Sequence, residues 1–321
     1  MRIISTGSAV PKLKVTNEMF SNVIDTSDEW IFSRTGISSR FIADGETAES
    51  LAVDAAKAAI TAAGIETSDI GLLICASITS EYLTPSLACL VQRDLGLNED
   101  ILAFDVNAAC SGFIYTLGVA QSLMKSGMMR GKYALLIGSE RLSRITNYED
   151  RSTCVLFGDG AGAIIAEPSD GVFEFFTGAR GDVEPLRIGA PAAPINPFAQ
   201  PYKSPAPTIY MDGQAVFKFA VEVMVKSVRE VLGKAGKTAE DIAFFVCHQA
   251  NKRVIKNAAQ RLEVPLERFF MNIQTHGNTS AASIPLALAE LNSSGRLCRG
   301  DDIVFAGFGG GLTYGAVYMA W

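Results

Sequence analysis

Histidine is scarce in this sequence, because His248 and His276 are the only two among 321 residues. Any imidazole chemistry must therefore use one of these side chains. Six cysteines are scattered through apolar stretches, and none forms a C-x-x-C pair, which argues against a zinc site and a disulfide framework. We expect most of them to be small buried side chains, and we expect no metal site.

Long hydrophobic runs and a basic charge excess are also lacking. No run approaches the ~18 apolar residues of a membrane span. The first residues, Met1 to Lys14, contain no apolar segment long enough for a signal peptide. A net charge of −6 gives no bulk attraction to nucleic acid or to an anionic membrane. The expectation is a cytoplasmic protein that binds neither nucleic acid nor membrane.

The sequence does contain an internal duplication. The segment Ala63–Ala76 aligns with Ala235–His248, with five identities in fourteen positions. Each copy predicts a helix that ends at glycine, a short turn and a buried strand. A second pair follows in the same order, since Ser126–Gly138 resembles Ser294–Gly307 with one residue inserted. Two matches in the same order indicate a chain built from two similar halves.

The two halves are predicted to be α/β units covering residues 1–168 and 169–321. Helical patterns over Leu51–Ala63 and Val216–Leu232 alternate with short apolar strands, which predicts layered sheets with helices between or around them. A proline-rich stretch, Pro185–Pro207, lies between the halves and is too long for a simple turn. It is either a linker or a functional loop over a site.

Cys110 is the first candidate for chemistry. An apolar run before it predicts a strand, and Phe113–Met124 has apolar residues at helical spacing, so Cys110 falls where a strand enters a buried helix. A helix N-terminus lowers the pKa of a thiol, and an adjacent backbone N–H can bind a developing oxyanion. The alternative is an inert buried cysteine, which is the commoner fate of a free cysteine.

His248 and Asn278 are the other candidates. His248 ends an apolar strand just before a polar turn, which suits a site, although a purely structural histidine remains an alternative. Asn278 lies among small residues, where the alternative is a helix cap. In the duplication His248 matches Ala76, and the segments leading to Cys110 and Asn278 match each other. Since equivalent strand ends can converge on the pseudo-axis of a duplicated fold, the three residues could meet.

Two glycine-rich segments do not predict nucleotide binding. Gly309, Gly310 and Gly311 follow the strand Ile303–Ala306, but the Lys-Ser/Thr of a P-loop is lacking. The run Gly158–Gly162 has the wrong spacing for a dinucleotide fingerprint, and a strand rather than a helix is expected after it.

Taken together, these segments resemble the ketoacyl synthase III family, within the thiolase-like condensing enzymes. The matching segments cover essentially the whole chain in the family's order. They are Asp25–Ile31, Ser33–Ile37, Ala108–Phe113, Asp150–Thr153, Phe157–Gly162, His248–Asn251, Gly277–Ser283 and Gly307–Gly311.

The resemblance implies a duplicated thiolase-like fold with five layers, α/β/α/β/α, assembled as a homodimer. It implies an acyltransferase with a Cys110–His248–Asn278 triad, with acyl-coenzyme A as a substrate and no cofactor. Cys110 would take the acyl group of the primer, with the N–H groups of Cys110 and Gly310 as oxyanion hole. His248 and Asn278 would then stabilise the enolate formed when malonyl-acyl carrier protein loses carbon dioxide, giving a 3-ketoacyl product that starts fatty acid biosynthesis. Burial would lower the pKa of His248 and keep it neutral.

The resemblance also implies binding residues. Trp30 and Arg151 would flank the adenine of coenzyme A, with Arg34 and Asn251 nearby. The acidic acyl carrier protein would dock on a basic cluster of Lys252, Arg253 and Lys256, for which the plainer interpretation is a solvated helix face.

The sequence departs from the family's pattern in three places. Thr84 stands where better-known members carry a bulkier side chain that floors the partner's acyl pocket, which Leu142 and Phe157 would also line. His276 replaces a more usual aromatic residue, and we interpret it as structural. The segment from Gly178 to Pro207 is unlike the common pattern. These departures leave the identity of the primer open.

Competing functions are a related thiolase-like acyltransferase or condensing enzyme of secondary metabolism or with another primer, a Cys-His hydrolase, and a non-catalytic synthase subunit. A biosynthetic thiolase would be expected to carry a second cysteine near the glycine-rich end, where none stands. Asn278 and the duplication favour condensation over hydrolysis, and Cys110 argues against a non-catalytic subunit.

Overall fold

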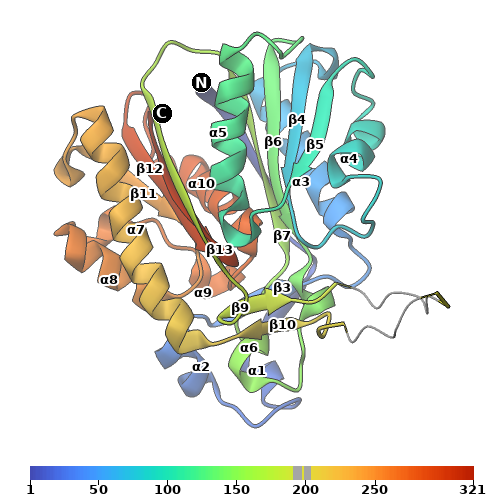
Figure 1. Ribbon diagram of the computed structural model, residues 1–321, viewed down its shortest axis with the longest axis vertical. Coiled ribbons are helices and arrows are strands. Elements are labelled where there is room, and N and C mark those ends of the chain that lie inside the picture. Colours follow the sequence, from blue (N-terminus) through green and yellow to red (C-terminus); the bar gives the residue numbers. More distant parts are fainter. Residues whose placement is uncertain (191–196, 199–203) are drawn as a thin grey trace.

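A computed structural model describes residues 1–190, 197–198 and 204–321 of the chain. Two central sheets stand side by side with helices between them and on their outer faces (Figure 1). One sheet has the order β1-β7-β6-β4-β5 and the other the order β11-β12-β13-β8. The first contains β1 (Arg2–Ala9), β4 (Ile70–Ala76), β5 (Leu102–Val106), β6 (Tyr133–Glu140) and β7 (Gly160–Glu167). The second contains β8 (Phe173–Asp182), β11 (Phe244–Cys247), β12 (Asp302–Gly309) and β13 (Gly311–Ala320).

The predicted duplication appears in the pairing of the strands. In both halves a repeated strand runs parallel to its neighbour, β4 with β6 and β11 with β12. In both, that neighbour pairs antiparallel with the next strand, β7 or β13, which pairs antiparallel with β1 or β8. The first sheet has a fifth strand, β5, which pairs with β4. On the matching side of β11, the described residues show a single parallel bridge, between Phe245 and Phe269. The boundary near residue 168 stays a prediction.

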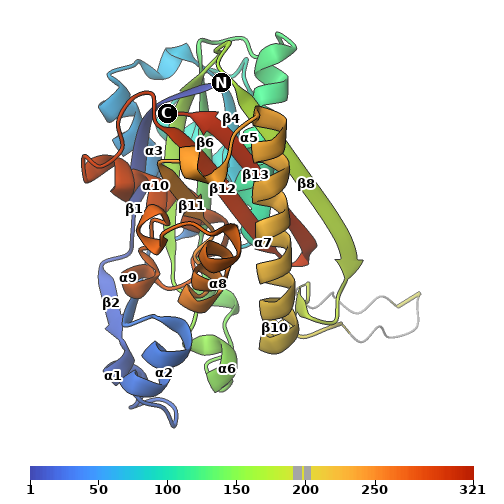
Figure 2. The ribbon, with the colours of Figure 1, turned by 90° about the vertical axis from the view of Figure 1, so that its left-hand side faces the viewer.

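The helices form three layers around the sheets. Between the sheets stand α5 (Gly112–Lys125) and α10 (Ser283–Ser293), while α3 (Ala48–Ala63) and α4 (Leu87–Leu95) cover the first sheet. The second sheet is covered by α7 (Gly213–Ala235) and α8 (Lys252–Leu262), seen along the front of Figure 2. The predicted α/β/α/β/α order and the predicted helices are confirmed.

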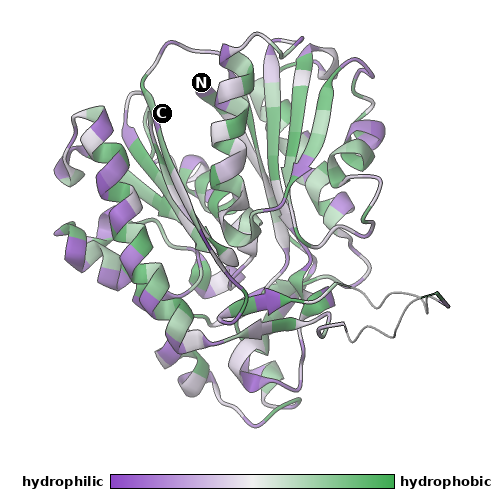
Figure 3. Cartoon of the chain, in the orientation of Figure 1, coloured by the Kyte–Doolittle hydropathy of each residue, from purple (hydrophilic) through white to green (hydrophobic). Residues whose placement is uncertain are grey.

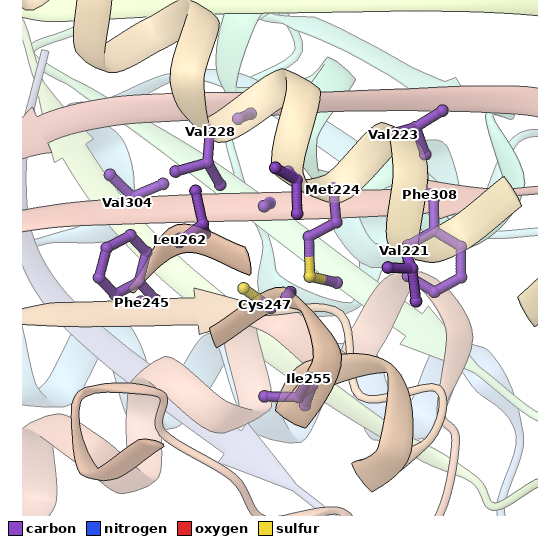
Figure 4. Packing of buried hydrophobic residues seen from close by; sticks show 14 of the residues in the cluster. Val221, Val223, Met224, Val228, Phe245, Cys247, Ile255, Leu262, Val304 and Phe308 are labelled. Carbon is purple, nitrogen blue, oxygen red and sulfur yellow. The ribbon is translucent and has the colours of Figure 1, made fainter. Parts of the chain in front are cut away.

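The alternation of strand side chains produces these layers. On β4, Leu72 and Ile74 face the central helices, whereas Leu73 and Cys75 face α3 and α4. Apolar residues therefore dominate both sheets, while polar residues gather on the outer helices (Figure 3). Outside the second sheet, Met224 and Val228 of α7 pack with Cys247 of β11 and Leu262 of α8 (Figure 4).

Glycine ends both repeated helices as predicted. Gly64 after α3 and Gly236 after α7 have φ of 64° and 65°, a left-handed conformation that glycine adopts without strain. At the other end, the Asp212 side chain accepts hydrogen bonds from the first N–H groups of α7.

A smaller region of short elements covers the carboxyl ends of the central strands. It has two small antiparallel sheets and an apolar cluster of its own around Ile31, Leu142 and Phe157. The elements are α1 (Asn17–Phe20), α2 (Asp28–Thr35), α6 (Arg151–Cys154), α9 (Ile273–His276), β2 (Leu13–Thr16), β3 (Ser39–Ile42), β9 (Leu186–Ile188) and β10 (Ile209–Met211). The predicted proline-rich stretch thus contains β9, which borders the cavity described below. This favours a functional segment over a plain linker.

Candidate active site

Cys110 lies where β5 leads into α5, as predicted. It sits in a single 3-10 turn, Ala109–Ser111, whose first residue has a left-handed φ of 46°. The matching turn in the second half, Ser280–Ala282, begins with Ser280 at φ 48°. The backbone of β12 packs directly on the nucleophile, since a Cβ on Gly309 would lie 2.6 Å from the Cys110 nitrogen. The duplication therefore extends to the strained turns at the centre of the molecule.

The expected lowering of the thiol pKa is wrong. Burial raises the pKa of Cys110 to about 12, and the contact with the Ser280 hydroxyl offsets only part of this. The negative charge of Glu140 raises it further. Loss of water around the thiolate therefore outweighs the favourable position near a helix N-terminus.

His248 follows β11 and is 1% exposed. Its Nδ1 lies 2.7 Å from the Ser283 hydroxyl, which also accepts a hydrogen bond from the Gln249 N–H. A hydroxyl that donates its proton to Nδ1 leaves the imidazole proton on Nε2, which is the tautomer that would present an N–H to the cavity. Burial lowers the pKa of His248 to about 3, as the sequence predicted, so the ring is neutral and presents an N–H donor.

Asn278 is held by both its backbone and its side chain. Its N–H donates to the Leu156 carbonyl, and its own carbonyl accepts from the Gly158 N–H. The side-chain oxygen accepts from the Ser280 N–H at 2.9 Å. The described part of the chain offers the amide NH₂ no hydrogen-bond partner, so this group is available as a donor.

One cavity of about 1030 Å³ collects most of the predicted site residues. Cys110, His248 and Asn278 all line it. So do Gly310, Trp30, Arg34, Asn251, Arg253, Leu142 and Phe157. Arg151, Lys252, Lys256 and Thr84 are not among its lining residues. A cavity that joins arginine side chains to the half-buried Cys110 thiol suits a long substrate with an anionic end.

Trp30 and Arg151 are closer together than a base between them would require. The Arg151 guanidinium carbon lies 4.8 Å from the Trp30 ring centroid, and that of Arg34 lies 4.6 Å from it. A stacked base needs ~7 Å between the outer planes, twice an ordinary contact distance. Arg151 also donates to the Asp25 carbonyl at 2.8 Å. Entry of adenine between them would therefore need a shift of the Arg151 side chain.

The basic cluster lies on the solvent side of α8. Arg253 and Lys256 are exposed and Lys252 is partly exposed, while Val254 and Ile255 are buried beneath them. Asn251 caps this helix by accepting from the Arg253 N–H, and it donates to the Arg34 carbonyl at 3.0 Å. The cap thereby joins the cluster to the mouth of the cavity.

The three predicted acyl-pocket residues separate in space. Leu142 and Phe157 are buried and line the cavity. Thr84 is exposed, whereas its neighbour Leu83 lines the cavity although 92% of its surface is exposed. Sequence reasoning had not singled out Leu83.

His276 and the five cysteines other than Cys110 do not line the cavity. His276 lies 2.9 Å from Glu290 through Nε2 and 2.8 Å from the Thr275 hydroxyl through Nδ1, which agrees with a structural role. All six cysteines are free thiols. Cys75, Cys154 and Cys247 are buried, but Cys89 and Cys298 are exposed, so the expectation of burial is wrong for these two.

Among the described residues no group of histidine, cysteine and acidic side chains is arranged to hold a metal ion. Within the same ranges, no helix has the length and apolarity to span a bilayer.

Two residues that support His248 had no signal of their own in the sequence. Ser283 orients the ring from the start of α10, and Phe308 of β12 contacts it edge-on at 5.2 Å between centroids. Both stand within segments that matched the family, but neither residue type predicts a role.

Comparison with known proteins identifies the family of the chain. Family models for 3-oxoacyl-[acyl-carrier-protein (ACP)] synthase III match residues 104–181, and for its C-terminal part residues 232–321. The beta-ketoacyl-[acyl-carrier-protein] synthase III of Clostridium acetobutylicum is 46% identical over 100% of this chain and 98% of its own.

Solved structures agree with these matches. The crystal structure of 3-oxoacyl-[acyl-carrier-protein] synthase III from Aquifex aeolicus superposes with a TM-score of 0.91 at 44% identity, covering 100% of this chain and 99% of that one. The priming beta-ketosynthase of a polyketide biosynthetic pathway gives a TM-score of 0.90 at 35% identity, covering 99% and 95%.

Proposed function

The chain belongs to the 3-oxoacyl-[acyl-carrier-protein] synthase III family, and from this premise we propose how its residues carry out the condensation that initiates fatty acid synthesis. The reaction is a decarboxylative Claisen condensation of an acyl-coenzyme A primer with malonyl-acyl carrier protein. The observation that carries the assignment of residues is the meeting of Cys110, His248 and Asn278 on one cavity. No cofactor enters this scheme, since acyl-coenzyme A is consumed as a substrate.

Cys110 performs the first half-reaction. Its thiolate attacks the primer thioester, coenzyme A leaves, and the acyl group stays on the sulfur. The N–H groups of Cys110 and Gly310 receive the oxyanion of the tetrahedral intermediate. Support comes from the contact of Gly309 with Cys110, which brings the glycine-rich end of β12 against the nucleophile.

His248 and Asn278 perform the second half-reaction. Malonyl decarboxylation places a negative charge on the thioester oxygen, which needs donors that keep their protons. The neutral Nε2–H of His248 and the free amide NH₂ of Asn278 are such donors. The carbanion then attacks the acyl-enzyme, and the Cys110 thiolate leaves.

Coenzyme A binds along the arginine-edged mouth. Trp30 offers a ring for stacking, with Arg34, Arg151 and Asn251 around it. Arg151 moves away from Trp30 when the adenine enters. The acyl carrier protein then docks on Lys252, Arg253 and Lys256, whose exposed charges complement an acidic surface beside the same mouth.

The working form is a cytoplasmic homodimer. The loop before α4 exposes large apolar side chains, Tyr82 at 56% and Leu83 at 92%, which a second copy would cover. Thr84 next to them would then reach the partner's acyl pocket, beside Leu142 and Phe157. A threonine there leaves room for primers longer or more branched than acetyl.

The test separates the two half-reactions. Wild type should retain an acyl group on Cys110 when mixed with acyl-coenzyme A, whereas Cys110→Ser should retain none, as read by mass spectrometry of the intact chain and its peptides. Asn278→Ala and His248→Ala should lose malonyl decarboxylation by ~10²–10³-fold and lose less of primer transfer. Normal labelling of Cys110→Ser, or equal loss of both half-reactions, would contradict the assignment.

A second candidate is the priming step of a polyketide pathway. It is favoured by the likeness to the priming beta-ketosynthase, which covers nearly all of both chains. The same chemistry would then act on another primer, and the group found on Cys110 after exposure to a mixture of acyl-coenzymes A would decide between them.

A further inference from the structure

Two hydroxyl groups lie between the turn that holds the nucleophile and the start of β13, and they have no part in the scheme above. Ser111 closes the turn that contains Cys110 and is fully buried. Its Oγ lies 2.7 Å from Oγ1 of Thr313, which is the third residue of β13 and lines the cavity. The two residues are 202 positions apart in the sequence, so this contact joins the two halves of the chain.

Each hydroxyl also reaches a backbone carbonyl. Ser111 Oγ lies 2.8 Å and Thr313 Oγ1 lies 3.1 Å from the carbonyl oxygen of Ala108. Thr313 Oγ1 lies 3.0 Å from the carbonyl oxygen of Gly310, which belongs to the predicted oxyanion hole. The Ala108 carbonyl also accepts from the Ser111 N–H at 3.1 Å, so it does not depend on either hydroxyl for a donor.

The two hydroxyl protons can serve these contacts in only a few ways. Each hydroxyl has one proton, and two oxygens at 2.7 Å need a proton between them. Of the two hydroxyls, only that of Thr313 reaches the Gly310 carbonyl. The arrangement that serves both contacts therefore has Ser111 donating to Thr313 and Thr313 donating to Gly310.

Gly310 is a residue that little else restrains. It is the one residue between β12 and β13, and it stands between two further glycines. Glycine has the widest backbone freedom of any residue. A Cβ on Gly310 would meet its nearest neighbour, the Cβ of Ala109, at an ordinary contact distance of 3.6 Å, whereas one on Gly309 would lie 2.6 Å from the Cys110 nitrogen. Close packing thus holds Gly309 against the nucleophile but leaves Gly310 room to turn.

Building on the proposed function, in which the N–H groups of Cys110 and Gly310 receive the oxyanion, we propose that Thr313 and Ser111 are positioning residues for the Gly310 N–H. β12 fixes the chain before Gly310, and the Thr313 hydroxyl fixes the carbonyl that follows its Cα. With both sides held, the N–H keeps one direction. Ser111 links Thr313 to the turn of Cys110, so the two oxyanion donors, which come from opposite halves of the chain, stay at one separation.

This role predicts a loss in the rate of primer transfer rather than in primer binding. An oxyanion hole stabilises the tetrahedral intermediate more than the bound thioester. Thr313→Val keeps the shape of the side chain and removes its hydroxyl, and it should slow primer transfer ~10-fold, less than the ~10²–10³-fold cost of removing a donor outright. Ser111→Ala should act in the same direction, and the double variant should be little slower than Thr313→Val, because the two hydroxyls act in series.

The alternative is that the hydroxyls only hold the two halves of the chain together. Their loss would then lower the melting temperature, while the folded enzyme would transfer primer at the wild-type rate. A general loosening of the site would instead slow malonyl decarboxylation as well. In our proposal decarboxylation without primer stays within ~2-fold of wild type, because His248 and Asn278 rather than the oxyanion hole stabilise its charge.

Single-turnover transfer followed by quenched-flow mass spectrometry over a range of acyl-coenzyme A concentrations tests this, since it separates the rate of transfer from the affinity for the primer. A second readout is the infrared carbonyl band of the acyl group on Cys110, isolated by a ¹³C label. Hydrogen bonds to a carbonyl oxygen lower its stretching frequency, so the band should move to higher frequency in Thr313→Val.

A rescue variant and a matched control accompany these measurements. Thr313→Ser retains the hydroxyl and should keep the rate and the band of wild type. Ser139→Ala removes another fully buried hydroxyl, which binds the Ala48 carbonyl at 2.6 Å and does not line the cavity. It should leave both readouts unchanged.

The proposal is overturned if Thr313→Val transfers the primer at the wild-type rate, if its defect is weaker binding with an unchanged rate, or if decarboxylation falls as much as transfer. Should Thr313→Val fail to fold, Ser111→Ala decides the question, and an unchanged rate and band there overturn the proposal as well. Failure of the proposed function would look different, because wild type itself would then carry no acyl group on Cys110.

Discussion

Lowering the pH from about 8 to about 5 should leave malonyl decarboxylation almost unchanged, because His248 stays neutral throughout. Burial lowers the pKa of His248 to about 3. At pH 5 such a group is ~99% neutral, whereas a histidine with the ordinary value of ~6.5 would be only ~3% neutral, a ~30-fold difference in the competent form. The sign follows from desolvation, which disfavours the charged imidazolium.

The assay is release of labelled carbon dioxide from malonyl-acyl carrier protein without primer, at saturating carrier concentration. Primer transfer in the same buffers is the internal comparison, because it requires the thiolate of Cys110, whose pKa is raised by burial. We expect a flat profile for decarboxylation and a rate of primer transfer that rises with pH, with full recovery on return to pH 8. A tenfold fall in decarboxylation per pH unit below ~6.5 would refute the reasoning, since His248 would then titrate at its ordinary value.

Three further substitutions test other parts of the site. Ser283→Ala should slow decarboxylation ~10-fold by releasing the tautomer of His248, with primer transfer unchanged; equal losses would show a general packing defect. Arg253→Glu should raise KM for the malonyl-carrier substrate and barely alter primer transfer from acyl-coenzyme A, because charge reversal acts at the protein partner's surface; a common effect on both substrates would place Arg253 in the coenzyme A site. Thr84→Phe should shorten the preferred primer and spare acetyl transfer, since each buried methylene adds ~0.8 kcal/mol; competition between acetyl- and longer acyl-coenzymes A measures this, and an unchanged preference would place the pocket floor elsewhere.

The layered fold was predictable because its signals are local. Glycine at the end of a helix, followed by a turn and a buried strand, occupies fourteen consecutive residues and occurs twice. The parallel strands β4 and β11 and the helix ends at Gly64 and Gly236 follow from that pattern. The inequality at β5 was not predictable, because Phe269 meets β11 through a single bridge that leaves no strand pattern in the sequence.

The error over the Cys110 thiol has a physical cause. A helix N-terminus can be recognised from adjacent residues, and its effect on a thiol is fixed in direction. Desolvation depends on every element that excludes water, here β12 through Gly309 and the turn at Ser280, both far away in sequence. Desolvation therefore changes the pKa of the thiol more than the helix N-terminus does, and residues adjacent in sequence do not reveal it.

The sequence by itself determined the fold and the family, and it singled out Cys110, His248 and Asn278 as the candidates for the chemistry, because repeats and short motifs reveal all of these. Only the tertiary structure decided which groups surround these three side chains. The Ser283 hydroxyl lies against Nδ1 of His248, the Ser280 N–H orients the Asn278 amide, and Gly309 packs on Cys110 from the other half of the chain. The direction of a hydrogen bond and the charge of a side chain depend on the neighbours that folding brings together. The linear sequence does not show which residues those neighbours will be.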